Sequence, residues 1–564
     1  MKRKMMFWSL ILLLLVPGQF AFADEEKSLE QVAEQVIEPR YLSILKQWNE
    51  VGQGNAQDFE RVVTPADFLS IDENSLLSSG ESKEYGDQVY AWRNKDTVTI
   101  EVDVEEEGLY ELGFDYYPLG EGIVPIEGSI KVNGEYPYFE SRRITFPKDW
   151  KSATNDFEQD RFGDEIIPEQ LPIEQWHFIK AEDSSHLQAR PLKYQLKEGK
   201  NTITLENSRG EMLLGNIYVS GVGTIPTYEE YRENHAGDLT ETNSITIEAE
   251  HPLKKNSSFI RPVNRQDASV VPYERDKRLL NAIGGESWET SGQTASWEME
   301  VEEAGYYQIS LKVLQEKQSG FPVFRTFMIN GEVPFEEVES YSFQQEKNWV
   351  NETLSNEDGE PYYFYLEKGK NTLTLKGDAS PVNRTLFEMD EVMKGIEQLS
   401  LSIKRLTGNN QDRSRGWRIT EYMPEIEGEL TSWADKLEGE SEYLLELSDG
   451  KESVEIVSLN IAVERLRELA SDPDKIPARL TQLSEGSSSV AQLLGNATLD
   501  LKKQPLIMDR IYIHGDEKLP KPELGFFAKT KESVLKFFHS FQSNTLATEK
   551  VDDDVVDVWV NRPR

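Results

Sequence analysis

Apolar and polar residues alternate along two long stretches of the chain and then give way to a helical pattern. Residues 98–104 alternate with period 2, and a second alternating run follows Gly108 after an acidic turn. Residues 295–301 and the run after Gly305 repeat this arrangement. Because period-2 alternation places one side of a strand on a core, the pattern predicts two copies of one β-rich unit.

Two further matches support the repeat. Asn-Gly pairs at 133–134 and 330–331 stand between apolar runs, where they favour a hairpin because both residues tolerate positive φ. Residues 196–205 and 366–375 match nearly position for position. This last match has a smaller offset than the others, so the first copy carries extra residues. We assign them to the polar stretch 146–175 and expect an inserted surface loop.

Many short strands separated by turn residues are typical of an antiparallel β-sandwich or jelly roll. We place the two modules at residues 56–225 and 240–382, with a linker at 226–239 and a helical lead-in at 24–55. The predicted fold class is therefore multi-domain β plus α, with two antiparallel β-sandwich or jelly-roll modules followed by a helical bundle.

Helical spacing begins directly after the second module. Leu386, Met389, Met393 and Ile396 recur every three or four residues, and further patterns of this kind follow. We predict a bundle of about four helices over residues 384–545. An alternative is that these helices wrap a domain that is not part of the chain.

The C-terminal residues carry two further patterns. An apolar stripe at 529–541 is expected to pack on the protein itself, and the alternative is a membrane surface. Residues 546–564 form an acidic linker followed by the strand pattern Val555–Val560. We interpret this pattern as the first strand of a further domain.

The N-terminus has the pattern of a secretory signal. Three basic residues at 2–4 precede an apolar run at 5–16, and Ala21-Phe22-Ala23 is a small-x-small cleavage site before Asp24. The alternative, a membrane anchor, is disfavoured because a span needs about 20 apolar residues. We therefore expect residues 1–23 to be removed and the mature protein to be secreted, with peripheral cell-surface association at most.

The charge of the chain restricts its partners. Sixty-one basic residues face 101 acidic ones, for a net charge of -40. A field of this sign repels phosphate backbones and anionic lipids, so nucleic acid is excluded as a partner. The charge serves solubility or, alternatively, collects cations such as calcium.

The absence of cysteine excludes disulfides, zinc–thiolate sites, a thiol nucleophile and a lipid-anchored cysteine.

No catalytic constellation stands out. The six histidines show no metal-ligand spacing, and neither H-E-x-x-H nor G-x-S-x-G occurs. Carboxylates are so numerous that choosing a glycosidase-like pair among them would carry no information. We therefore expect a protein that is not an enzyme and requires no cofactor.

Binding of oligo- or polysaccharide is more plausible, because sugars are held by flat aromatic faces together with a few fixed polar groups. Tryptophans flank the inserted loop of the first module, and one stands at the matching place in the second. The candidate carbohydrate-binding residues are Tyr117, Trp150, Trp176, Trp349 and Asn351. The alternative for each aromatic residue is a place in the core.

The second module opens with an acidic strand. Glu248 and Glu250 alternate there, and their carboxylate oxygens could help to hold a structural calcium ion. The alternative is a solvated strand edge.

The second module resembles carbohydrate-binding modules of families 6 and 35, which are galactose-binding-like jelly rolls. The similarity rests on Glu248-Ala249-Glu250, the strand before Gly305, Trp349 and residues 366–375. It implies that Trp349 and Asn351 contact sugar. In the first module, residues 215–218 resemble the closing strand of these folds. The second module has no clear counterpart, because residues 381–383 run straight into a helix.

The whole arrangement resembles the N-terminal region of large extracellular solute-binding proteins of Gram-positive ABC sugar importers. In that resemblance the strand within 546–564 starts a missing solute-binding domain. It implies an exported, non-catalytic carbohydrate-binding protein at the cell surface, with importer membrane subunits as partners. The alternatives are a structural or interaction protein that positions a partner, and a non-catalytic appendage of a secreted glycoside hydrolase.

Overall fold

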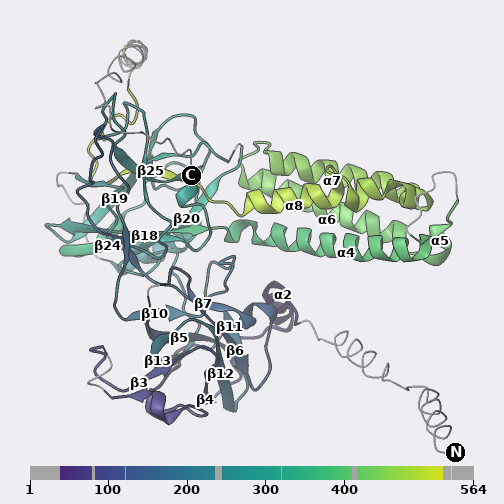
Figure 1. The fold of residues 1–564 in the computed structure, drawn as a ribbon, viewed down its shortest axis with the longest axis horizontal. Helices are drawn as coiled ribbons and strands as arrows, with labels where there is room; N and C mark the ends of the chain where they lie inside the picture. Colours follow the sequence, from purple (N-terminus) through teal and green to yellow (C-terminus); the bar gives the residue numbers. More distant parts are fainter. Residues whose placement is uncertain are drawn as a thin grey trace, which may run out of the picture.

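A computed structural model describes most of the chain. The described residues are 38–78, 83–120, 122–235, 244–318, 320–408, 416–524 and Leu535. The predicted signal peptide 1–23, the stripe at 529–541 apart from Leu535, and the terminal segment 546–564 lie outside them. The described chain forms two β-sandwich modules and an arm of helices that extends from the second module (Figure 1).

Module 1 is an antiparallel sandwich of two sheets. The seven-stranded sheet has the spatial order β10 (His177–Lys180), β5 (Gly108–Pro118), β13 (Met212–Gly221), β3 (Val89–Trp92) and β2 (Leu76–Leu77), with β1 (Glu60–Val63) on β13 and β11 (Lys193–Leu196) on β5. The four-stranded sheet has the order β4 (Thr97–Val104), β12 (Gly199–Arg209), β6 (Ile126–Val132) and β7 (Ile144–Phe146).

The core of module 1 follows from the alternation in its strands. In β4, Val98, Ile100, Val102 and Val104 are buried while the residues between them face outward. Helix α2 (Tyr41–Val51) closes one end of this core with two buried aromatic side chains. Part of the predicted helical lead-in is therefore an integral piece of the module.

Module 2 repeats this plan. One sheet has the order β16 (Pro262–Asn264), β17 (Leu280–Gly284), β25 (Ile507–His514), β19 (Gly305–Leu314) and β22 (Val350–Thr353), with β14 (Ile245–Glu248) on β25 and β23 (Phe364–Leu366) on β19. The other has the order β21 (Tyr341–Phe343), β20 (Val323–Ile329), β24 (Gly369–Asp378), β18 (Thr294–Val301), β15 (Lys254–Lys255), β8 (Trp150–Ser152) and β9 (Gln170–Pro172). Helix α3 (Tyr228–Asn234) leads into the module through a capping box between Thr227 and Glu230.

The Asn-Gly hairpins form as the sequence predicts. Asn133 and Gly134 have φ of 51° and 87°, and Asn330 and Gly331 have φ of 52° and 93°. Both turns therefore occupy the left-handed region that these residues tolerate best.

The helical arm is a bundle, as expected. It contains α4 (Asn383–Thr407), α5 (Ile419–Tyr422), α6 (Ile426–Leu447), α7 (Val454–Ala470), the 3-10 segment Pro473–Arg479, the π-helical turn Thr481–Glu485 and α8 (Val490–Leu501). Figure 1 shows α4, α6, α7 and α8 running side by side. No helix in the described ranges combines the length and the apolar character that a membrane crossing requires.

The predicted extent of the helical region, 384–545, needs correction. Beyond Leu501 the chain returns to module 2, and residues 507–514 form β25 between β17 and β19. Strand β13 of module 1 likewise pairs with β3, β5 and β1. The closing strand of module 2 is thus present, and the bundle is inserted between its last two strands.

The inserted stretch 146–175 also differs from the expected free surface loop. Its strand β8 pairs with β15 of module 2, with Trp150 opposite Lys255, and β9 extends the same sheet. Glu165 Oε2 accepts a hydrogen bond of 2.6 Å from the backbone nitrogen of Leu280. An edge strand offers unpaired backbone groups, and module 1 supplies partners for those of module 2.

Candidate functional site

Module 1 carries aromatic side chains on the outer face of its seven-stranded sheet. We call Tyr85, Trp176, Phe178 and Tyr218 the aromatic face. Phe178 stands on β10, and a Cβ on Gly113 of β5 would lie 2.8 Å from its ring. Tyr218 on β13 packs edge-on against Phe178 with ring centroids 5.4 Å apart. Phe178 is 56% exposed, so its ring is accessible to a ligand.

Asp115 fixes the polar centre of this face. Phe114 and Tyr116 point into the core, so alternation along β5 turns Asp115 outward. Its Oδ2 accepts hydrogen bonds from the hydroxyls of Tyr85 at 2.5 Å and Tyr218 at 2.7 Å. Burial and then the hydrogen bond to Asp115 raise the pKa of both tyrosines, which keeps each hydroxyl protonated as a donor.

Two of the residues predicted from the sequence lie together here. The Trp176 ring packs 4.2 Å from that of Tyr85, and its Nε1 donates to the backbone oxygen of Lys83 at 3.0 Å. Tyr117 lies beneath Trp176, only 6% exposed, and its hydroxyl donates to Glu174 at 3.3 Å. Trp176 therefore belongs to the aromatic face, and Tyr117 supports it from below.

Trp150 lies elsewhere. It is 4% exposed and sits in β8, where the inserted stretch joins the sheet of module 2. Because the ring is covered at the interface between the modules, we drop Trp150 from the candidate carbohydrate site.

Trp349 is covered as well, and Asn351 lies half-buried nearby. Trp349 is 1% exposed and packs in a small cluster with Val270, Ala282 and Leu314. The Asn351 side chain donates to the backbone oxygen of Pro520 at 2.7 Å. Trp349 therefore serves packing here, while Asn351 is half-buried and holds the segment after β25.

The sheet face of module 2 that corresponds to the aromatic face is filled by polar side chains. Lys312 Nζ lies 2.7 Å from Asp509 Oδ2, with both side chains buried. Ser310 Oγ lies 2.7 Å from His514 Nε2. The segment after β25 crosses this face, where Leu524 N donates to Ser269 Oγ. Among the residues that the structure describes, the face of module 1 is open and the equivalent face of module 2 is covered.

Strand alternation could have identified Phe178 and Tyr218 from the sequence. His177 and Ile179 flank Phe178 on β10, and Ile217 and Val219 flank Tyr218 on β13. Each aromatic residue therefore points away from the core. The sequence-based prediction missed them because it concentrated on tryptophans outside the strands.

A second candidate site lies at the start of module 2. Glu248, Glu250 and His251 each bring one ligand atom within 4.8 Å of the others. Glu250 is 1% exposed, and its Oε2 has no hydrogen-bond partner among the described residues. Burial raises the pKa of Glu250 to about 8 and lowers the pKa of His251, so both groups are held towards their neutral forms. These donors fit a divalent cation.

The sequence pointed to both carboxylates of this cluster but missed His251. The histidine directly follows Glu250, and its place beside the carboxylates depends on the turn after β14. Phe157 of the inserted stretch stacks on its ring at 5.1 Å. The cluster therefore lies beside the interface between the modules.

The bundle matches a known protein family. Residues 384–501 fit the family described as "Bacterial solute-binding protein, 4-helix bundle domain". The match covers a minority of the chain. No curated protein matches the chain in sequence.

Solved structures show a distant similarity to carbohydrate-binding modules. A CBM35 from Cellvibrio japonicus is 15% identical, with 29% of this chain and 94% of that chain covered and a TM-score of 0.19. A family 35 module from Clostridium thermocellum is 13% identical, with 28% and 97% covered and a TM-score of 0.19. The C-terminal CBM6 of a Zobellia galactanivorans laminarinase is 11% identical, with 29% and 99% covered and a TM-score of 0.16. At such low scores the sandwich architecture rests on the strand pairing described above.

Proposed function

We propose that this chain is an exported, non-catalytic carbohydrate-binding protein that serves a solute-binding system, and that glycan lies across the aromatic face of module 1. The open arrangement of Trp176, Phe178 and Tyr218 around Asp115 carries the proposal. The family match of the bundle to bacterial solute-binding proteins supports it.

The chemistry of the aromatic face suits a sugar. Flat rings cover the apolar side of a pyranose, while a carboxylate and phenol groups bind its hydroxyls. The Tyr85 and Tyr218 hydroxyls are already oriented by Asp115, so little ordering is needed on binding. The acidic chain favours a neutral glycan over a polyanionic one.

The cellular role follows from the proposed class. The signal pattern at 1–23 directs the chain out of the cell, where it would present glycan to an ABC-type sugar importer and contact the importer's membrane subunits. Module 2 and the bundle would then hold module 1 in place.

Binding of the full-length chain to a glycan array and to soluble polysaccharides tests this function. We expect Phe178→Ala and Trp176→Ala each to weaken binding at least about tenfold, because each removes a stacking surface. Phe259→Ala is the matched control, since Phe259 is a comparably exposed ring, 64%, on module 2. Absence of binding to every glycan would refute the proposal and favour the structural or interaction role.

A cation at Glu248, Glu250 and His251 is a separate proposal, carried by the unpartnered Oε2 of the buried Glu250. After chelation, added Ca²⁺ or Zn²⁺ at about 100 times its Kd should raise the Tm of the wild type by about 5 °C or more. Glu250→Gln should abolish the rise, whereas Glu300→Gln, at an exposed site of the same module, should keep it. An equal response of all three proteins would rule out the site.

A further inference from the structure

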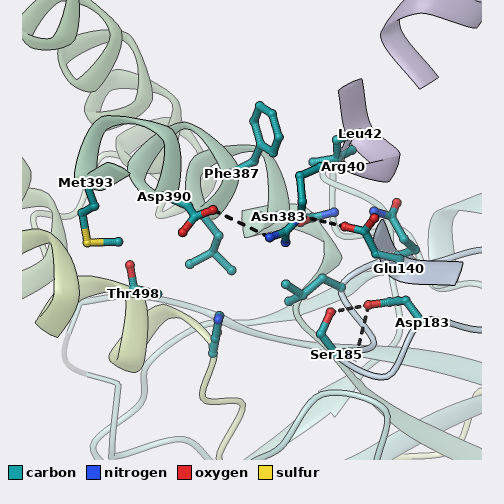
Figure 2. Close-up of a pocket in the computed structure, with 14 residues that line it drawn as sticks. Arg40, Leu42, Glu140, Asp183, Ser185, Asn383, Phe387, Asp390, Met393 and Thr498 are labelled. Atoms are coloured by element: carbon teal, nitrogen blue, oxygen red, sulfur yellow. Dashed lines mark hydrogen bonds and ion pairs between the residues drawn. The ribbon is translucent and has the colours of Figure 1, made fainter. Parts of the chain in front are cut away.

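A cavity of about 130 Å³ lies between module 1 and the helical bundle. We call it the junction pocket. Module 1 contributes Arg40 and the stretch 183–188, while the bundle contributes side chains of α4 and α8 (Figure 2). The junction pocket shares no residue with the aromatic face or with the cluster of Glu248, Glu250 and His251.

Two buried polar atoms in the walls of the junction pocket have no partner among the described residues. Asp183 is 2% exposed, and only its Oδ2 is engaged, by the backbone nitrogen of Ser185 at 3.1 Å and by the Ser185 hydroxyl. Asp183 Oδ1 accepts no hydrogen bond, and Thr498 Oγ1 neither accepts nor donates one, among the described residues. Because unsatisfied buried polar groups are costly and rare, these two atoms indicate that the pocket takes a hydrogen-bonding occupant.

The remaining walls combine charge with apolar surface. Arg40 Nε lies 2.9 Å from Glu140 Oε1, and Arg40 Nη1 lies 3.7 Å from Asp390 Oδ2. The Phe387 side chain and its neighbour Leu386 supply apolar contact. Since acidic and basic groups face the cavity together, neither a polyanion nor a polycation matches it.

The volume restricts the size of the occupant. One water needs about 10–15 Å³ of such space, so the junction pocket holds roughly ten water-sized groups. A hexose has about that many non-hydrogen atoms, and its hydroxyls both donate and accept, as Asp183 Oδ1 and Thr498 Oγ1 require.

We propose that the junction pocket binds a single neutral hexose, as a second sugar site independent of the aromatic face. The occupant touches module 1 and the bundle at once. Ion pairs such as that of Lys46 with Glu388, 3.2 Å apart, also join these units. A bound hexose therefore strengthens the attachment of the helical arm to module 1.

Isothermal titration of the full-length chain with glucose, galactose, mannose and fructose tests this site. We expect at least one of these sugars to bind with a Kd in the millimolar range or below. Thr498→Val, which keeps the shape but removes the hydroxyl, should weaken that binding by about tenfold. Thr498→Ser keeps the hydroxyl and should remain close to the wild type.

Two outcomes would overturn the proposal. One is that no sugar of the panel binds at concentrations up to about 20 mM, which would leave a water-filled cavity. The other is that Thr498→Val binds as the wild type does. Phe178→Ala, which alters only the aromatic face, should leave hexose binding unchanged, so failure of this proposal and failure of the glycan site are distinguishable.

Discussion

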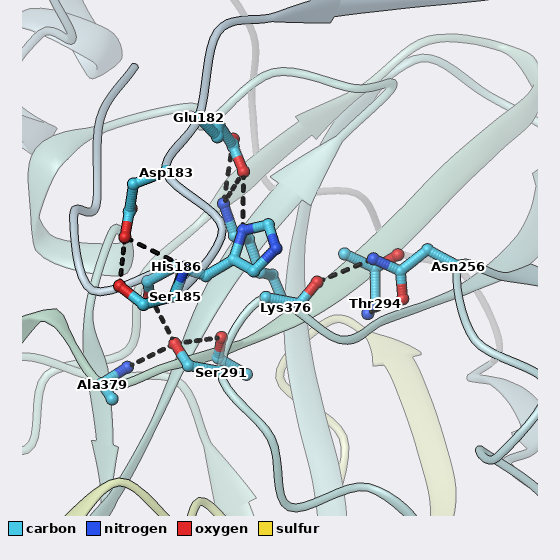
Figure 3. A network of polar contacts seen from close by, with 11 residues as sticks. Glu182, Asp183, Ser185, His186, Asn256, Ser291, Thr294, Lys376 and Ala379 are labelled. Atoms are coloured by element: carbon cyan, nitrogen blue, oxygen red, sulfur yellow. Dashed lines mark hydrogen bonds and ion pairs between the residues drawn. The ribbon is translucent and has the colours of Figure 1, made fainter. Parts of the chain in front are cut away.

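A few charged and polar residues hold module 1 against module 2. Figure 3 shows Glu182 of module 1 facing Lys376 of β24, whose Nζ lies 3.0 Å from each carboxylate oxygen. His186 Nδ1 lies 3.2 Å from the same carboxylate, and the backbone oxygen of His186 accepts a hydrogen bond from Ser291 Oγ at 2.6 Å. The interface thus depends on a carboxylate that stays ionised.

The Glu182 carboxylate makes stability sensitive to acid. Burial alone would raise its pKa, but Lys376 and His186 bring the pKa of Glu182 down to about 2. A carboxylate with a lowered folded-state pKa contributes stability above its ordinary value of 4.5 and loses it as the pH falls towards 2. Glu182→Gln should cost about 2 kcal/mol at pH 7 because Lys376 is left unpaired, with the difference from the wild type shrinking between pH 4.5 and 2.

Chemical unfolding at pH 7 and at stepped acidic pH measures this effect. Glu198→Gln, at an exposed position, is the control and should follow the wild type at every pH. If Glu182→Gln were as stable as the wild type at pH 7, the ion pair would contribute nothing to the interface.

At the scale of elements, β25 decides how module 2 is built. It lies centrally, pairs with β14, β17 and β19, and buries Met508, Ile511 and Ile513. Just before it, Arg325 donates to the backbone oxygen of Gln504 at 2.7 Å, which fixes the return of the chain from the bundle. Module 2 is therefore incomplete without residues that follow the bundle.

Truncating the chain after the bundle and deleting the bundle itself should therefore have opposite effects on the folding of module 2. A chain that ends after Leu501 lacks the central strand, so module 2 should lose its protease-resistant core and the burial of Trp297. A chain without residues 384–501, in which a short Gly-Ser segment joins β24 to β25, should keep both, since module 1 connects β12 to β13 by a tight turn. Limited proteolysis and tryptophan fluorescence distinguish the two results. A folded module 2 in the truncated chain would contradict this role of β25.

At the scale of the whole molecule, three units are tied together by exchanges between distant parts of the sequence. Strands β8 and β9 of module 1 extend a sheet of module 2. The bundle lies in the sequence between β24 and β25, which are both strands of module 2. The bundle core includes Phe321 and Phe324 of module 2 and Leu187 of module 1. The aromatic face thereby keeps a fixed position relative to the helical arm.

The sequence by itself determined the local structure. Period-2 alternation, the Asn-Gly turns and the repeated stretch before Leu375 located both modules, and helical spacing located the bundle. It also pointed to Trp176 and to Glu248 and Glu250, because their residue types carry recognisable chemistry. These features depend on neighbours within a few positions, which the sequence displays directly.

Only the tertiary structure decided which strands pair and which faces stay open. β25 and β8 pair with strands that are far away in the sequence, and the residues of β25 and β8 alone do not predict which strands these are. The burial of Trp150 and Trp349, the approach of His251 to the carboxylates and the junction pocket all depend on such long-range packing. The physical reason is that a side chain's exposure is set by what the rest of the chain places over it, whereas its periodicity is set by the backbone alone.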